Sequence, residues 1–184
     1  METIHTLRPT GINTRDIMYS GWPNVAADCY KNVNEATKSE TDYNYNLDTR
    51  GFAQTQSVLY TLGTYSGGDA ISRITLKGYY RVDNNGVVSG ARARFRIKTG
   101  GTIYEDSFFN PDTSAYTLYT KDYTTNPKTG NPWSAAEVNA LAAGDSLQSI
   151  WTGVSNNSRS YCCQFWVTVV EAAVESGGNF FLVM

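Results

Sequence analysis

Strict alternation of apolar and polar side chains runs through two stretches in the middle of the chain. In Arg73–Val82 the apolar side chains occupy nearly every second position, and in Ala91–Lys98 they alternate with arginine and lysine. Because successive side chains of a strand point to opposite faces, this pattern predicts half-buried strands. The later stretch Ser160–Ala172 carries a similar apolar face. The predicted core of these strands comprises Ile74, Leu76, Val82, Phe95, Ile97, Phe165, Val167 and Val169.

Shorter strands are predicted on both sides of this central region. They are Glu2–Leu7, Gln56–Leu62, Thr102–Phe108, Tyr116–Tyr123 and Ser146–Trp151. Residues that favour turns separate several of them, and Asp83–Gly86 predicts a hairpin between the two alternating stretches. The pair Gly100–Gly101 predicts a second hairpin. The polar stretch Lys31–Arg50 predicts a long loop with one short extended piece.

One helix is predicted in the second half of the chain. Ser134 and Glu137 have the spacing of a capping box, in which the serine caps the helix and the glutamate reaches back. The run Ala135–Ala143 is rich in alanine and leucine, which are good helix formers. Gly144 is placed to end the helix in the left-handed conformation.

These elements predict an all-β fold, an antiparallel and jelly-roll-like β-sandwich with one short α-helix at about 135–143. Residues 1–172 are expected to form a single domain with a long irregular N-terminal part. The tail, residues 173–184, contains a Gly-Gly break followed by an apolar run. Such a run would be an aggregation hazard if it stayed exposed, so we expect it to form an interface in the same copy or with a neighbouring one. Its candidate residues are Phe180, Phe181, Leu182, Val183 and Met184.

Basic side chains gather on the polar face of the predicted hairpin. If its two strands pair, seven of the fifteen basic residues share one surface, which makes it a candidate anion-facing surface. The alternative is a solvated face whose charges are relieved by carboxylates such as Glu105 and Glu171. The seven residues are Arg73, Lys77, Arg81, Arg92, Arg94, Arg96 and Lys98.

Residues that carry catalytic or metal chemistry are sparse. His5 is the only histidine, no phosphate-binding loop occurs, and carboxylates qualify for a glycosidase pair by residue type alone. The sequence therefore predicts a non-enzyme without catalytic, metal or cofactor-binding residues. The cysteines are expected to stay reduced rather than form a disulfide framework, and they are Cys29, Cys162 and Cys163. The carboxylates considered are Glu105, Asp106, Asp122 and Glu137.

The overall charge and hydropathy narrow the range of partners. The net charge of −2 and the lack of exposed aromatics between the basic residues argue against nucleic acid as a partner. No stretch approaches the length of a membrane span, and Met1–Pro9 lacks the apolar region of a signal peptide. Three tyrosine-rich segments are candidate sugar contacts, with strand packing as the alternative. They are Tyr43–Tyr45, Tyr60–Tyr65 and Tyr116–Tyr123.

Several motifs in the second half resemble a recurrent β-sandwich domain of bacteriophage and prophage virion structural proteins. They are Thr124–Pro127, Thr129–Gly130, Trp133–Gly144 and Tyr161–Val169, and the similarity spans Ile74–Glu171. The resemblance implies a structural role on the particle, such as capsid decoration, and it implies no catalytic residues. The expected location is the virion, after synthesis in the host cytoplasm. The expected partners are other copies of the chain or other virion proteins, and the alternative function is a carbohydrate-binding receptor module of a phage fibre or tail.

Overall fold

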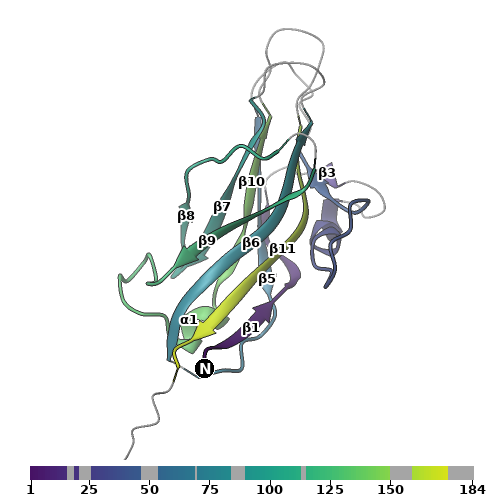
Figure 1. Cartoon of the computed structure of the whole chain (residues 1–184). Coiled ribbons are helices and arrows are strands. Elements are labelled where there is room, and N and C mark those ends of the chain that lie inside the picture. The colour runs from purple at the N-terminus through teal and green to yellow at the C-terminus, as the bar shows by residue number, and fades with distance from the viewer. Residues whose placement is uncertain are drawn as a thin grey trace, which may run out of the picture.

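Two antiparallel β-sheets pack face to face in the computed structural model (Figure 1). The structure describes residues 1–15, 19–20, 26–46, 54–68, 70–83, 90–112, 115–149 and 159–173. Within them, sheet A follows the order β3 (Tyr19–Ser20), β4 (Asn44–Tyr45), β11 (Arg159–Glu171), β6 (Ile71–Asp83) and β9 (Thr117–Tyr123), with β1 (Thr3–Leu7) also paired to β11. Sheet B follows the order β2 (Pro9–Arg15), β5 (Gln54–Leu62), β10 (Ala142–Ser149), β7 (Arg92–Thr99) and β8 (Thr102–Glu105). The predicted antiparallel β-sandwich is therefore confirmed.

The core lies between the two sheets and consists of the predicted apolar faces. All eight predicted core residues are at most 2% exposed. Rings from the two sheets meet directly, with the centroids of Tyr80 and Phe95 5.7 Å apart and those of Phe95 and Phe165 6.3 Å apart. The side chains of Arg92, Arg94 and Arg96 are only partly buried on the opposite face of β7, as predicted.

The predicted hairpin between the two alternating stretches is wrong. β6 pairs with β11 and β9 in sheet A, whereas β7 pairs with β10 and β8 in sheet B, so the chain crosses between the sheets after Asp83. Both edges of β6 are occupied, which leaves no place for β7 beside it. The second predicted hairpin is confirmed, because β7 and β8 pair through Gly100 and Gly101, which have φ angles of 54° and 79°.

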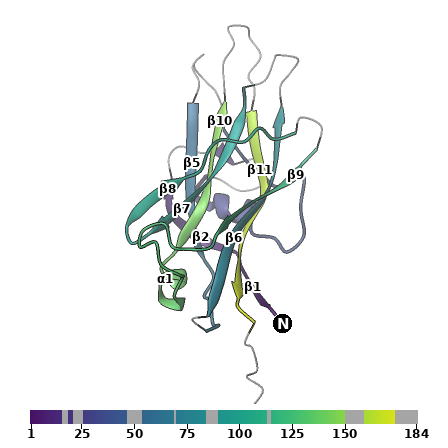
Figure 2. The same ribbon diagram turned by 60° about the vertical axis from the view of Figure 1, so that its left-hand side comes forward.

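The predicted helix begins correctly but is shorter than expected. α1 spans Ala135–Asn139, and the Ser134–Glu137 capping box is present. Gly144 does not end the helix, because it lies within β10. A side chain there would collide with the backbone of Val58 on β5, so glycine is needed for close strand approach. Figure 2 shows α1 at the end of the sandwich where β1 begins.

The N-terminal part is more regular than the sequence indicated. It contains β2, the short β3 and a 3-10 helix, η1 (Ala26–Asn32), none of which was predicted. β4 is the short extended piece expected within Lys31–Arg50. The tail residues Phe180, Phe181, Leu182, Val183 and Met184 lie outside the described residues, so their interface role stays a prediction.

A carboxyl group lies in the apolar interior. Asp145 of β10 stands opposite Phe95 in the strand register, so its side chain points between the sheets, where it is fully buried. The Tyr80 hydroxyl donates a hydrogen bond to Oδ2 at 3.1 Å. Burial raises the pKa of Asp145 to about 6, although hydrogen bonds from Cys162 and Tyr80 and the nearby Arg96 oppose this shift. The buried acid is thus poised to change charge in mildly acidic solution.

Candidate functional site

Aromatic side chains gather on the outer face of sheet A. In the register of β6 and β11, Arg81 stands opposite Tyr161 and Lys77 opposite Trp166, while Tyr45 of β4 also stands opposite Tyr161. Residues directly opposite in an antiparallel pair share a face, so strand alternation brings these side chains together. We call this cluster the aromatic face and define it as Tyr43, Tyr45, Tyr79, Tyr116, Tyr161 and Trp166.

Contacts between the rings give the aromatic face a fixed geometry. The ring of Tyr161 packs against Tyr43 at 5.2 Å, edge to face, and against Tyr45 at 5.9 Å, stacked. Tyr79 and Trp166 form a second pair, with centroids 5.9 Å apart. Tyr116 and Tyr161 are largely buried, whereas Tyr43, Tyr45, Tyr79 and Trp166 keep part of their surface in solvent. The buried rings of Tyr116 and Tyr161 therefore support a layer of four partly exposed aromatic rings.

Cationic side chains lie over these rings. The guanidinium carbon of Arg81 is 4.7 Å from the ring centroid of Tyr161 and 5.1 Å from that of Tyr116. The Lys38 ammonium lies 5.3 Å from the Tyr79 ring, and it also forms an ion pair with Glu40. Tyrosine, tryptophan and arginine are the residues that contribute most to binding energy in protein interfaces. This arrangement suits recognition of a macromolecular surface or of an amphipathic ligand.

Two of the three predicted tyrosine-rich segments contribute to the aromatic face. Tyr43 and Tyr45 come from the first segment and Tyr116 from the third. The middle segment does not contribute, because Tyr60 is a core residue and Tyr65 lies at another position. Sequence reasoning did not assign Tyr79 or Trp166 to the site. The sequence signal for both residues is the same. Each aromatic residue occupies a strand position where the alternation of apolar and polar residues predicts a polar side chain.

The seven basic residues of the candidate anion-facing surface do not form one surface. Arg73, Lys77 and Arg81 lie on sheet A, whereas Arg92, Arg94, Arg96 and Lys98 line the outer face of sheet B. The reason is the crossing of the chain between the sheets. The prediction of a single anion-facing surface is therefore wrong.

The four basic residues of β7 have partners within the chain. Glu105 of β8 forms ion pairs with Arg94 and with Arg96, whose Nε lies 2.9 Å away. Arg92 donates to Gln148, and the ammonium of Lys98 donates to Asn13 at 3.2 Å. The predicted compensation by Glu105 is confirmed. The compensation expected from Glu171 is wrong, because Glu171 lies on β11 in the other sheet and contacts His5, Tyr65 and Gly68.

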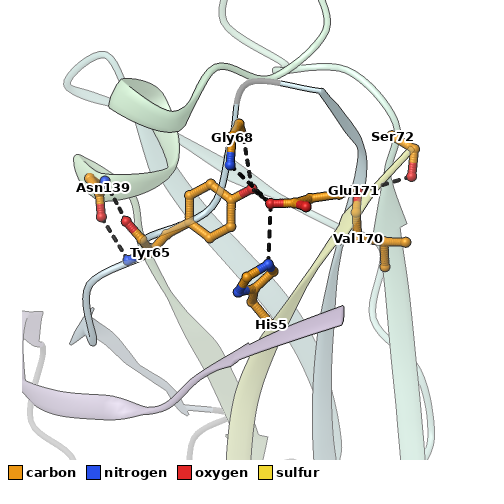
Figure 3. A network of polar contacts seen from close by, with 7 residues as sticks. All are labelled: His5, Tyr65, Gly68, Ser72, Asn139, Val170 and Glu171. Atoms are coloured by element: carbon orange, nitrogen blue, oxygen red, sulfur yellow. Dashed lines mark hydrogen bonds and ion pairs between the residues drawn. The ribbon is translucent and has the colours of Figure 1, made fainter. Parts of the chain in front are cut away.

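Glu171 joins β1, β11 and the segment after β5 (Figure 3). Its Oε1 lies 3.2 Å from His5 Nε2 and 2.7 Å from the Tyr65 hydroxyl, and it accepts a hydrogen bond from Gly68 N at 2.9 Å. These contacts, the Tyr65 hydroxyl foremost, lower the pKa of Glu171. Tyr65 is also tied to α1, because Asn139 forms hydrogen bonds with its backbone N and O. His5 is thus partly buried, and its contact with Glu171 gives it a structural role.

A hollow of about 400 Å³ opens between the edge strands β8 and β9. Two of the four carboxylates considered for a glycosidase pair, Glu105 and Asp106, line it. Asp106 contacts the Lys121 ammonium at 3.0 Å and accepts a hydrogen bond from the Tyr123 hydroxyl at 2.9 Å. Asp122 instead accepts from Thr75, and Glu137 belongs to the helix cap. The two carboxylates in the hollow are both held by cationic side chains.

The cysteines, the potential metal ligands and the helices bear on redox chemistry, metal binding and membrane insertion. Cys29, Cys162 and Cys163 are all buried thiols. Burial raises the pKa of Cys163 to about 12, which makes its reactive thiolate scarce at neutral pH. Across the residues that the structure describes, no group of three potential ligands is arranged to hold a metal ion. No helix among those residues is long and apolar enough to cross a membrane.

No family model matches the sequence, and no curated protein matches it. Among solved structures, the CBM22-1 xylan-binding domain from Paenibacillus barcinonensis Xyn10C shares 10% identity at a TM-score of 0.33, over 89% of this chain and 99% of that chain. A chain from the structure of infectious bursal disease virus Gt strain shares 13% identity at a TM-score of 0.33, over 97% of this chain and 57% of that chain.

Proposed function

We propose that this protein is a non-enzymatic structural component of a virus particle, which assembles with other copies of itself or with a neighbouring shell protein through the aromatic face. The aromatic face is the observation that carries the proposal. It combines partly exposed tyrosine and tryptophan rings with a guanidinium group stacked on two of them. Such residues, packed against a rigid sheet, supply large contact area at low entropic cost.

The virion assignment draws on the sequence motifs described above. They fall in the sandwich itself. The Trp133–Gly144 motif spans α1 and the start of β10, and the Tyr161–Val169 motif lies in β11. The second of these motifs contains two members of the aromatic face, Tyr161 and Trp166. The proposed location is the particle, after synthesis in the cytoplasm of the host cell.

Carbohydrate recognition is the second candidate function. The adjacent rings of Tyr79 and Trp166 favour it, because neighbouring aromatic faces suit the apolar side of a sugar ring. The two functions make different predictions for the isolated protein. Assembly predicts self-association or binding to a particle without added ligand, whereas a receptor module predicts saccharide binding by the monomer.

Replacing Tyr79 and Trp166 together with alanine is expected to weaken self-association or particle attachment roughly 30-fold or more. A hot-spot truncation costs at least about 2 kcal/mol, and every 1.4 kcal/mol is about tenfold in affinity. Both residues are only partly buried, so the melting temperature should change little. Sedimentation velocity over a range of concentrations measures self-association, and cosedimentation measures attachment to the particle.

The control is Ile103→Ala, which removes an exposed apolar side chain from β8 on the other sheet. It should leave both measurements unchanged. A double variant at Tyr79 and Trp166 that assembles as tightly as the unchanged protein would contradict the proposed role of the aromatic face.

Truncation after Ser176 tests the proposed role of the apolar tail. The shortened protein is expected to stay folded, with a nearly unchanged melting temperature, and to lose assembly, because Phe180 and Phe181 are the large side chains that would anchor an interface. Unfolding on truncation would show that the tail belongs to its own core. Normal assembly would show that the tail is dispensable.

A further inference from the structure

We propose that the hollow between β8 and β9 is a binding site for a neutral saccharide, a small ligand site separate from the aromatic face. It is lined by Phe95, Phe109 and Tyr119 together with Glu105, Asp106, Ser107, Thr120 and Lys121. The hollow therefore combines an aromatic wall with polar groups at its rim. Its volume of about 400 Å³ falls at the small end of the range of roughly 300–1,000 Å³ usual for ligand pockets. This size suits one or two sugar rings.

The aromatic wall is held in position. The rings of Phe109 and Tyr119 are stacked, with centroids 4.3 Å apart and an interplanar angle of 13°. Phe109 is fixed by two backbone hydrogen bonds to Ala93, of 3.0 and 2.7 Å, and the Tyr119 hydroxyl donates to the Asn110 carbonyl at 3.0 Å. Both rings are partly exposed. The stacked rings cover each other's inner faces, so a sugar can pack only against an outer face of the pair, and it would do so without ordering loose side chains first.

The polar rim offers both acceptors and donors. Asp106 is anchored by Lys121 and by the Tyr123 hydroxyl, and Glu105 is anchored by two arginines. An ionised carboxylate has about four acceptor sites, so these contacts leave capacity for a ligand hydroxyl. The hydroxyls of Ser107 and Thr120 can donate or accept. Vicinal hydroxyl groups, which donate and accept at once, match such a mixed rim.

The balance of charge selects against ionic ligands. The two carboxylates face three cations in direct contact with them, Arg94, Arg96 and Lys121. A cationic ligand would have to displace one of these partners, and an anionic ligand would lie against two carboxylates. A neutral polyhydroxyl compound leaves all three ion pairs in place, so it fits the site better than either ion.

Titration of the isotopically labelled protein with neutral sugars tests the proposal. The probes are glucose, galactose, mannose, N-acetylglucosamine and their β-1,4-linked disaccharides, with glucuronic acid and glucosamine as charged comparisons. At least one neutral probe is expected to bind with Kd on the order of 1 mM, as suits a small exposed pocket. Amide signals of Asp106, Ser107 and Tyr119–Lys121 should shift, and the charged comparisons should bind at least several-fold more weakly.

Two variants and a control assign the binding to the hollow. Tyr119→Ala should weaken binding at least tenfold, and the conservative Asp106→Asn should weaken it several-fold while the melting temperature stays near that of the unchanged protein. The control is Leu118→Ala, because Leu118 is the exposed neighbour of Tyr119 on the opposite face of β9. Failure of every neutral sugar to bind would overturn the proposal. Shifts confined to Tyr79 and Trp166 would overturn it too, and would support carbohydrate recognition by the aromatic face. Neither outcome bears on assembly, which is measured without sugar.

Discussion

Replacing Asp145 with asparagine is expected to stabilise the protein by about 3 kcal/mol at pH 7. The carboxyl group is buried between the sheets, and its pKa is raised from an ordinary value of 3.8 to about 6. At pH 7 the folded protein must therefore hold a buried negative charge that the unfolded chain would expose to water. A shift of about two pH units corresponds to roughly 3 kcal/mol, and asparagine avoids this cost while retaining a partner for the Tyr80 hydroxyl.

The stabilities of the unchanged protein and of Asp145→Asn should also depend differently on pH. A carboxyl group whose pKa is raised on folding destabilises the protein as the pH rises from about 4 to about 6. Below pH 4 the group is protonated in both states, so the two proteins should differ least there. Urea unfolding at several pH values should show the advantage of Asp145→Asn growing across this interval and levelling off above it. An advantage that is the same at pH 4 and pH 7 would contradict the burial of a titrating carboxyl group.

Truncating Phe95 to alanine is expected to destabilise the protein by roughly 3–5 kcal/mol. Phe95 is 2% exposed and contacts Tyr80, Phe109 and Phe165, so its removal leaves a cavity between the sheets. Chemical denaturation of the unchanged protein and the variant measures the difference. The variant should also weaken saccharide binding, because Phe95 lines the hollow between β8 and β9.

The neighbouring residue provides the control for Phe95. Arg94→Ala removes a side chain of similar size from the outer face of the same strand, where it pairs with Glu105 and stacks on Phe108. Ion pairs at the surface contribute about 1 kcal/mol or less, so this variant should lose far less stability. An equal loss in both variants would show that the two faces of β7 are buried alike.

The faces of the strands could be predicted from the sequence, but their partners could not. Ile74, Leu76 and Phe95 are buried as the alternation requires, because period-two patterning determines which side of a strand faces the core. The same alternation results whether β7 lies beside β6 or across the core from it. Local patterning therefore cannot distinguish a hairpin from a crossing to the other sheet. Because the chain crosses, the predicted basic residues lie on two different sheets.

The candidate site could be predicted only in part for a related reason. Tyrosine-rich segments were visible in the sequence, but the aromatic face forms from three strands and two connecting segments, which the pairing of β11 with β4 and β6 brings together. Gly144 illustrates a second limit. At the end of an alanine-rich run it has the signature of a helix terminus, yet its role is to let β5 approach β10 closely.

The central claim, that this protein is a structural component of a virus particle, is tested most directly by a structure of the particle proposed to contain it. The account predicts that the domain is present in many copies, with Tyr79, Trp166 and the rest of the aromatic face buried against a neighbouring subunit. Absence of the protein from purified particles would contradict the account, and so would a particle in which the aromatic face of every copy remains in contact with solvent.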